Sequence, residues 1–422
     1  MEDFKNGIYD ARKQLGMPKT IVLGLQHVFA MFGATVLVPL LTGLSVSVTL
    51  FCAGIATLWF HFITKGKVPV YLGSSFAFLG AFASVASGDP AKLPYATGGV
   101  LCAGLVYVVL AGLIQVFGVK KVMKLFPPIV TGPIIVLIGL ILAPSALNNI
   151  VSSGQPARYS LAIIAIVVII VCNIFGKGMV KILPILISII VSYIVACVFG
   201  WVDFTSIGSN AIVALPPFFF PKFEIGAVVT FVVVSLAAII EHVGDVAAVG
   251  ATVGKNFIKD PGLTRTLLGD GIGTSIAGLL GGPANTTYSE NTGVVALTGV
   301  YDPFVLRVAA VVALLLSLFP AVDGFINTIP SEIIGGISFV LYGMISAIGL
   351  RTLVEHKVDF ANQRNVLIAA VIMVSGLAFN SQPIQISLGA STTLQFGGLA
   401  SAAIFGIILN AILPGKDYEF ES

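Results

Sequence analysis

Long apolar stretches follow one another along almost the whole chain, and short polar loops separate them. A helix needs about 20 residues to cross the ~30 Å hydrocarbon core of a bilayer. Such stretches occupy residues 20–43, 45–64, 95–117, 126–147, 159–176, 182–200, 225–250, 263–281, 304–320, 333–350, 364–380 and 394–413. Two further segments, 68–87 and 283–299, are apolar but interrupted by small polar residues. The pattern predicts an all-α polytopic membrane protein with about fourteen transmembrane segments.

The composition agrees with a bilayer environment. Hydrophobic residues make up 57% of the 422 residues and charged residues only 10%, whereas a soluble domain carries about 25% charged residues. The net charge of +3 is small, which argues against a nucleic-acid partner. The four cysteines lie in apolar runs without metal-site spacing, and no nucleophile with a base is apparent. We therefore expect no metal, no cofactor and no enzymatic activity.

The basic residues give an independent test of the predicted segments, because Lys and Arg gather in cytoplasmic loops. All but three of the 22 fall in one alternating set of loops and tails; the exceptions are Lys92, Arg158 and Lys222. This asymmetry predicts an even number of crossings and two cytoplasmic termini. The charged amino-terminal stretch leads into a full-length span without a small-residue cleavage site, so we expect a first membrane helix there and no removed signal peptide.

Three pairs of short motifs recur in the same order at a separation of about half the chain. Residues 26–28 are matched by 241–243, residues 74–76 by 286–288, and residues 126–128 by 329–330. A repeat of seven segments is odd-numbered, so its two copies must have opposite orientations in the membrane. The sequence therefore predicts two inverted seven-segment repeats, an arrangement typical of secondary transporters, whose substrate site lies at the midplane.

The two interrupted segments, the third and the tenth, occupy equivalent positions in this repeat. Residues 71–78 and 284–291 are rich in small polar and aromatic residues, and each stretch follows a proline, Pro69 or Pro283. We predict a short extended strand running into a half-helix in each. Extended backbone at membrane depth needs partners for its amides, and free amides facing a cavity would suit a planar heterocycle with donors and acceptors. Alternatively, these are ordinary Gly/Ser packing faces.

Three of the acidic residues inside predicted spans stand out. Glu241 and Asp245 lie one helical turn apart on one face, and Glu290 lies in the tenth segment. A carboxylate at the bilayer centre costs about 2.5 to 3.5 kcal/mol, so such residues indicate function. They are suited to carry a proton or to accept N–H bonds from a substrate, although Glu290 could instead cap a broken helix. For Asp270, near a predicted membrane border, we expect solvation at a helix end.

The motifs at residues 26–35, 71–78, 241–244 and 285–291 strongly resemble those of the nucleobase-ascorbate transporter family, also called nucleobase-cation symporter family two. Within that family they are most similar to bacterial uracil permeases, and the resemblance covers nearly the whole chain. It implies uracil uptake driven by protons through alternating access, commonly in a homodimer. The location it implies is the plasma membrane.

The resemblance also implies a division of the segments into a core domain and a gate domain. The core domain would contain segments 1–4 and 8–11, and the gate domain segments 5–7 and 12–14. The corresponding ranges are 1–19 for the amino-terminal tail, 20–124 and 223–325 for the core domain, 125–222 and 326–413 for the gate domain, and 414–422 for the carboxy-terminal tail.

The family's site residues can be transferred to this sequence one by one. Glu241 and Glu290 would bond the uracil ring, and the backbone at Phe76 and at Ser289 would bond its carbonyl and amide groups. Tyr288 and Phe76 would flank the ring. The resemblance further implies that Ala34 lines the site and that Tyr342 and His27 assist through indirect or water contacts. A buried core histidine is an alternative role for His27.

Two positions depart from the pattern of uracil permeases. Asp245 stands where those proteins carry His, and Ser289 where they usually carry Gly. We predict that Asp245 carries the coupled proton, with Glu241 as the next candidate. Asp at position 245 is more typical of purine-transporting relatives, so a xanthine or urate symporter is an alternative. An anion transporter of the same fold is disfavoured by the two acids at the expected site. A channel would need a ring of like residues around a pore, whereas the repeat predicts one asymmetric, occluded site.

Overall fold

The computed structural model describes residues 7–86, 88–123, 127–204, 212–387 and 393–415, and most of them are helical. The helices are α1 (Ala11–Leu15), α2 (Met17–Thr42), α3 (Val46–Ile63), α4 (Leu79–Ala86), α5 (Leu93–Phe117), α6 (Val119–Met123), α7 (Pro128–Val151), α8 (Tyr159–Phe175), α9 (Met179–Ile182), α10 (Pro184–Val198), α11 (Ile225–Val253), α12 (Leu263–Leu279), α13 (Ser289–Thr298), α14 (Pro303–Ser317), α15 (Pro320–Ile326), α16 (Ser331–Glu355), α17 (Gln363–Ser381) and α18 (Gly398–Ile412). The strands are β1 (Leu72–Ser74), β2 (Asn285–Thr287), β3 (Ile384–Ser387) and β4 (Thr393–Phe396). Each apolar segment expected from the sequence contains one of these helices.

Several helices have the length and composition of membrane spans. In the described part of the chain, eight are long and apolar enough to cross a bilayer, or up to nine if α14 and α15, bent by 86°, form one span. Shorter apolar helices occupy Phe76–Ala86, Pro184–Val198 and Gly398–Ile412. The chain is thus a multi-pass membrane protein. The fourteen crossings in two inverted repeats remain a prediction.

A first group of helices consists of α2, α3, α5, α11, α12 and α14, which pack against one another. Small residues allow the closest of these contacts, because they let helix backbones approach. At Gly104 of α5, an added Cβ would meet the backbone of Gly271 and Ser275 in α12. Ser275 also donates a hydrogen bond across this contact to the carbonyl oxygen of Leu101 at 3.1 Å.

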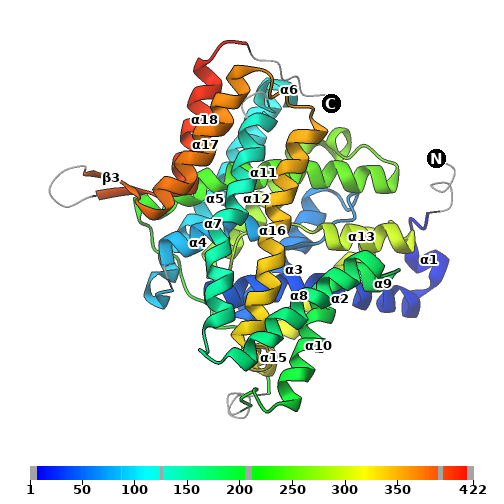
Figure 1. Cartoon of the computed structure of the whole chain (residues 1–422). Helices are drawn as coiled ribbons and strands as arrows, with labels where there is room; N and C mark the ends of the chain where they lie inside the picture. The colour runs from blue at the N-terminus through cyan, green and yellow to red at the C-terminus, as the bar shows by residue number, and fades with distance from the viewer. Residues whose placement is uncertain (1–6, 87, 124–126, 205–211, 388–392, 416–422) are drawn as a thin grey trace.

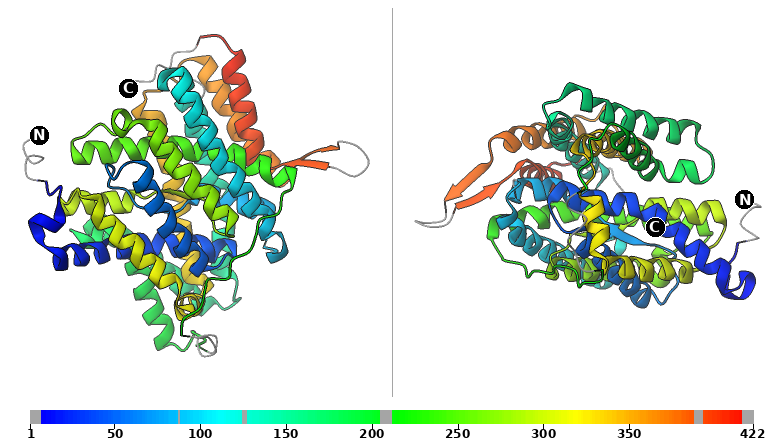
Figure 2. Two further views of the ribbon diagram at one scale, coloured as in Figure 1. Left: turned by 180° about the vertical axis from the view of Figure 1, so that it is seen from behind. Right: turned by 90° about the horizontal axis from the view of Figure 1, so that it is seen from below.

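A second group consists of α7, α8, α10, α16, α17 and α18. Its centre is the pair α7 and α16, which run side by side in Figure 1, and α17 lies against both α7 and α18. The contact again uses small residues, since Gly349 of α16 lies against the backbone of Gly132 and Val136 in α7. Seen from below, the two groups form layers that face each other (Figure 2).

Strands β1 and β2 meet at the centre of the first group, and we call this pair of strands the strand crossing. They pair antiparallel, with Leu72 opposite Thr287 and Ser74 opposite Asn285. The pair is extended by hydrogen bonds from the Ser75 amide to the Ala284 carbonyl (2.8 Å) and from the Tyr288 amide to the Tyr71 carbonyl (2.9 Å). The backbone of both interrupted segments is therefore satisfied by mutual pairing, as a low-dielectric environment requires.

The last expected span differs from the sequence-based prediction at its start. Residues 393–396 form β4, which pairs antiparallel with β3, and helix α18 begins only at Gly398. The β3–β4 hairpin projects away from the helices in Figure 1. Hydrophobicity alone did not separate this strand from the helix that follows it, because Leu394 and Phe396 are apolar like the helix and no charged residue marks the boundary.

Candidate functional site

Two half-helices begin directly after the paired strands. The short 3-10 helix Phe76–Phe78 and then α4 follow β1, whereas α13 follows β2 and starts at Ser289. Figure 1 shows α4 and α13 on opposite sides of the molecule, so the chain leaves the crossing in two directions. The first amides of a helix have no intrahelical acceptor and carry a partial positive charge. The amides of Phe76 and Ser289 are among these first amides, at the starts of the two half-helices.

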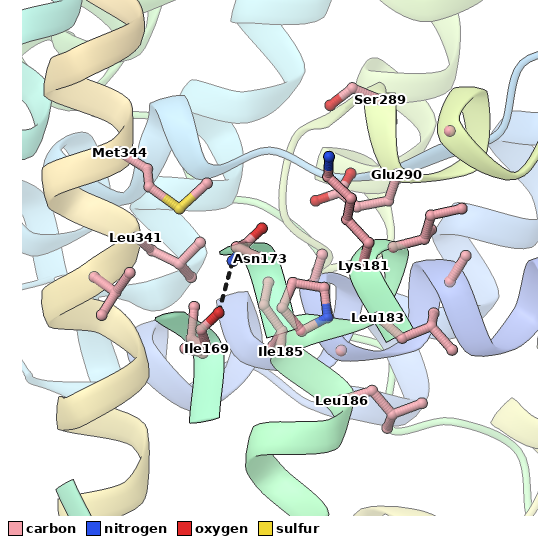
Figure 3. Close-up of a pocket in the computed structure, with 17 residues that line it drawn as sticks. Ile169, Asn173, Lys181, Leu183, Ile185, Leu186, Ser289, Glu290, Leu341 and Met344 are labelled. Atoms are coloured by element: carbon pink, nitrogen blue, oxygen red, sulfur yellow. Dashed lines mark hydrogen bonds between the residues drawn. The ribbon is translucent and has the colours of Figure 1, made fainter. Parts of the chain in front are cut away.

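A cavity of about 360 Å³ lies between the two helix groups. This volume is within the range of pockets that hold small molecules. On one side it is lined by α2 and by α13, which packs against α2 and α11 of the first group; these residues are Ala30, Gly33, Ala34, Ser289, Glu290 and Gly293. On the second side it is lined by α8, α10 and α16 of the second group and by α9, which packs against α8 and α10; these residues are Ile169, Asn173, Lys181, Ile182, Leu183, Pro184, Ile185, Leu186, Val340, Leu341 and Met344. Figure 3 shows these residues around the cavity. The lining is mostly apolar, with a few polar groups concentrated near Glu290.

The two glutamates lie on adjacent helices. Glu241 is on α11 and Glu290 is in the first turn of α13, and these helices pack against each other. Glu241 is not one of the residues that line the 360 Å³ cavity, but its side chain is solvent-exposed and Glu290 is partly exposed. Both acids therefore retain accessible surface.

Asp245 faces the strand crossing. The hydroxyl of Thr287 in β2 donates to a carboxylate oxygen of Asp245 at 2.6 Å. Asp245 lies one turn after Glu241 on α11, so this hydrogen bond ties the acidic face of α11 to the end of β2. No cationic side chain forms an ion pair with Asp245 among the described residues.

Tyr288 is part of the packing at the crossing, because only 3% of it is exposed. Its hydroxyl donates to the Ser74 carbonyl at 2.9 Å and also bonds the Ser74 hydroxyl at 3.1 Å and the Thr35 hydroxyl at 3.3 Å. The tyrosine ring lies on Gly73, where an added Cβ would collide with it. The close approach of ring and backbone thus requires glycine at position 73.

The remaining predicted site residues differ in whether they line the cavity. Ala34 lines the cavity, and Phe76 is half-buried beside the crossing. His27 is buried and holds α2 to α13, since the Asn291 amide lies 3.1 Å from its Nδ1 and donates to its carbonyl oxygen at 3.0 Å. Tyr342 is 2% exposed and does not line the cavity, whereas its neighbours on α16, Leu341 and Met344, do.

The expectation for Asp270 was wrong. Its carboxylate is fully buried and lies 2.8 Å from Nδ1 of His242, which is equally buried, although the angles are not those of a hydrogen bond. Helix α12 packs between α3, α5 and α11, and this packing encloses a residue that its position along the chain placed near a membrane border. His242 consequently faces α12 and not the cavity.

Sequence analysis missed two polar residues of the lining, Lys181 and Asn173. Lys181 was assigned to a loop because it falls in the basic set, but the short helix α9 places it at the cavity. Asn173 is a single amide in an otherwise apolar span, and its amide donates to the Ile169 carbonyl at 3.0 Å (Figure 3). A polar residue within an apolar span was the available signal for Asn173, and the prolines and glycines around α9 for Lys181.

Metal ligands are not clustered in the described ranges, where no group of three or more His, Cys, Asp or Glu residues could hold an ion. The polar groups near the cavity are instead carboxylates, helix-terminal amides, one lysine and one asparagine. They can form hydrogen bonds with a small polar molecule but offer no activated nucleophile.

The fold is shared with solved transporters. The transmembrane domain of a cyanobacterial bicarbonate transporter, BicA, superposes with a TM-score of 0.61 at 16% identity over 96% of this chain and 99% of that chain. The murine anion transporter Slc26a9 in its inward-facing state gives a TM-score of 0.67 at 11% identity over 94% of this chain and 68% of that one. At these identities the similarity concerns the fold alone.

Sequence comparison is more specific. A model described as "Permease family" matches residues 18–384. The uracil permease of Bacillus caldolyticus is 40% identical over 427 residues, covering 98% of this chain and 96% of that protein. The uracil permease of Bacillus subtilis is 41% identical over 411 residues, covering 93% and 92%. The chain therefore belongs to this permease family, the nucleobase-ascorbate transporters, whose members are transport proteins and not enzymes.

Proposed function

We propose that this protein takes up uracil across the cell membrane, with both termini in the cytoplasm, and that protons drive the uptake. The substrate is suggested by the uracil permeases to which the chain is similar over almost its whole length. The observation that carries the proposal is the cavity between the two helix groups, into which Glu290 and the start of α13 open. A uracil ring has N–H donors and carbonyl acceptors in one plane, and this site offers complementary groups.

The ligand would be held mainly by the first helix group. The carboxylates of Glu241 and Glu290 would accept the N–H groups, while the amides of Phe76 and Ser289 would donate to the carbonyl oxygens. Ala34 would lie against the ring beside Phe76. Tyr288 and His27 would act through the crossing and through α13, which their hydrogen bonds hold in place. Tyr342 would act indirectly, because its neighbour Leu341 lines the cavity and Tyr342 does not.

Alternating access would move the two helix groups against each other. We assign residues 20–124 and 223–325 to the core domain and residues 125–222 and 326–413 to the gate domain. The cavity lies between them, so a relative movement would open it first to one side and then to the other. A homodimer is part of the proposal only by analogy with the family.

Proton coupling would use Asp245, with Glu241 one turn away. Asp245 has no cationic partner among the described residues, and its carboxylate is linked to β2 by the Thr287 hydroxyl. A change in its charge would therefore change this hydrogen bond at the strand crossing, next to the site. Through this hydrogen bond, protonation of Asp245 would alter the positions of the binding residues that follow β2.

Uptake into proteoliposomes tests the whole proposal. Labelled uracil should accumulate when the outside is acidic and should only equilibrate without a pH gradient. Unlabelled xanthine or urate in excess should compete weakly, because a purine symporter is the alternative. Protein-free liposomes and the Glu290→Ala variant serve as controls. Uptake that is indifferent to the gradient, or stronger competition by xanthine than by uracil, would contradict the proposal.

A further inference from the structure

Lys181 is the one cationic side chain among the described residues that line the cavity. It lies on α9, which belongs to the connection between α8 and α10 on the second side. In Figure 3 its amine points across the cavity towards the Glu290 carboxylate. The lysine is exposed and takes part in none of the ion pairs found in the described part of the chain. An ammonium group that forms no ion pair with the described residues therefore faces the carboxylate proposed to hold the substrate.

Among the described residues that line the cavity, the other side chains that can donate hydrogen bonds are Asn173 and Ser289. The Asn173 amide already donates to the Ile169 carbonyl at 3.0 Å. Ser289 contributes its hydroxyl and amide from the first helix group, and the rest of the second side is aliphatic. A ligand that gives its N–H groups to Glu290 and Glu241 would direct a carbonyl oxygen away from these acids. Across the cavity, Lys181 supplies the strongest donor for such an oxygen.

We infer that Lys181 is a further substrate-site residue, which donates to a carbonyl oxygen of the bound nucleobase from the gate side. This inference rests on the proposed function. The ligand then bridges the two helix groups, with its donors on the α13 side and an acceptor on the α9 side. Charged hydrogen bonds are stronger than neutral ones, so a bridging ligand would favour the arrangement in which α9 approaches α13. A nucleobase without a carbonyl at that position would bind but close the site poorly.

The test pairs a protein variant with a ligand variant, so that coupling between the two can be measured. Equilibrium binding of uracil, 2-thiouracil and 4-thiouracil is measured on the purified full chain in detergent, because sulfur accepts hydrogen bonds more weakly than oxygen. The variants are Lys181→Met, which removes the charge, and Lys181→Arg, which keeps it. Lys177→Met is the matched control, since Lys177 is exposed in the same connection but does not line the cavity.

We expect Lys181→Met to weaken uracil binding by about tenfold or more, with partial recovery in Lys181→Arg and no change in Lys177→Met. The preference of the parent for uracil over one of the two thiouracils should also disappear in Lys181→Met. Unchanged uracil affinity would overturn the inference. So would weaker binding with the oxygen-over-sulfur preference intact, because Lys181 would then act only through Glu290.

Two further controls keep the outcome decisive. If Lys181→Met loses its cooperative thermal transition, Lys181→Gln replaces it under the same criteria. A parent protein that binds no uracil would defeat the proposed function itself, whereas parent binding with an indifferent Lys181 variant defeats only this inference. The two failures are therefore distinguishable in one set of titrations.

Discussion

The two walls of the cavity differ in the size and polarity of the residues that line them. The wall formed by α2 and α13 carries small residues such as Gly33, Ala34 and Gly293 beside Glu290, and a hydrogen-bonded strand crossing lies behind it. The wall formed by α8, α9, α10 and α16 is lined by larger aliphatic residues, with Lys181 and Asn173 as its polar members. Directional polar groups need fixed positions to be selective, and the crossing supplies that rigidity. Aliphatic contacts tolerate sliding, which would suit the movement that we propose for this wall.

The largest effect should follow from removing Glu241 or Glu290, the two acids proposed to hold the substrate. Glu241→Ala and Glu290→Ala should each lower uracil affinity by about 100-fold or more, because the N–H groups of the ligand would be left without their acceptors. Isothermal titration in detergent measures this, with the thermal transition as a check on folding. An affinity equal to that of the parent would remove the affected glutamate from the site.

The next effect concerns coupling and not binding. Asp245→Asn keeps an acceptor for the Thr287 hydroxyl but cannot change its charge. The variant should still bind uracil and exchange it across proteoliposome membranes, yet fail to accumulate it under a pH gradient. Thr287→Val is the matched control, because it removes the hydrogen bond and keeps the carboxylate. Accumulation by Asp245→Asn at the parent level would place coupling elsewhere, with Glu241 the next candidate.

A smaller effect should test the rigidity of the crossing. Tyr288→Phe removes the hydroxyl that bonds Ser74 and Thr35 and leaves buried groups unpaired, which costs about 1–3 kcal/mol. The variant should therefore unfold at a lower temperature in detergent. Tyr159→Phe is the comparison, since the Tyr159 hydroxyl makes no hydrogen bond within the described residues. Equal transition temperatures for the two variants would show that the crossing does not depend on this network.

The smallest effect should come from the aliphatic wall. Met344→Leu conserves volume and apolar character, so it should change stability by less than about 1.5 kcal/mol and uracil affinity only slightly. The same titrations measure it. A large loss of affinity in this variant would contradict the proposal that the aliphatic wall makes no specific contact with the ligand, because it would require such a contact from Met344.

Local chemistry made several features predictable. Apolar length located the helices, and the small polar residues beside Pro69 and Pro283 marked the segments that contain β1 and β2. The cost of a carboxylate in a bilayer singled out Glu241, Asp245 and Glu290. The position of Lys181 was not predictable in this way, because a lysine after a predicted span is normally in a solvated loop. The start of α18 was also missed, because hydropathy does not distinguish a strand from a helix in a short apolar run.

By itself, the sequence determined that the chain lies in a membrane, which segments are helical and which acids are unusual, because each depends on the energy of nearby residues in a bilayer. Only the tertiary structure decided what those residues face. It turned Tyr288 towards Ser74, buried Asp270 beside His242 and brought α9 to the start of α13. These arrangements bring together residues far apart in the chain: Ser74 is hydrogen-bonded to Tyr288, and Lys181 lines the same cavity as Glu290. Packing of helices around small residues sets such distances, and no local pattern encodes them.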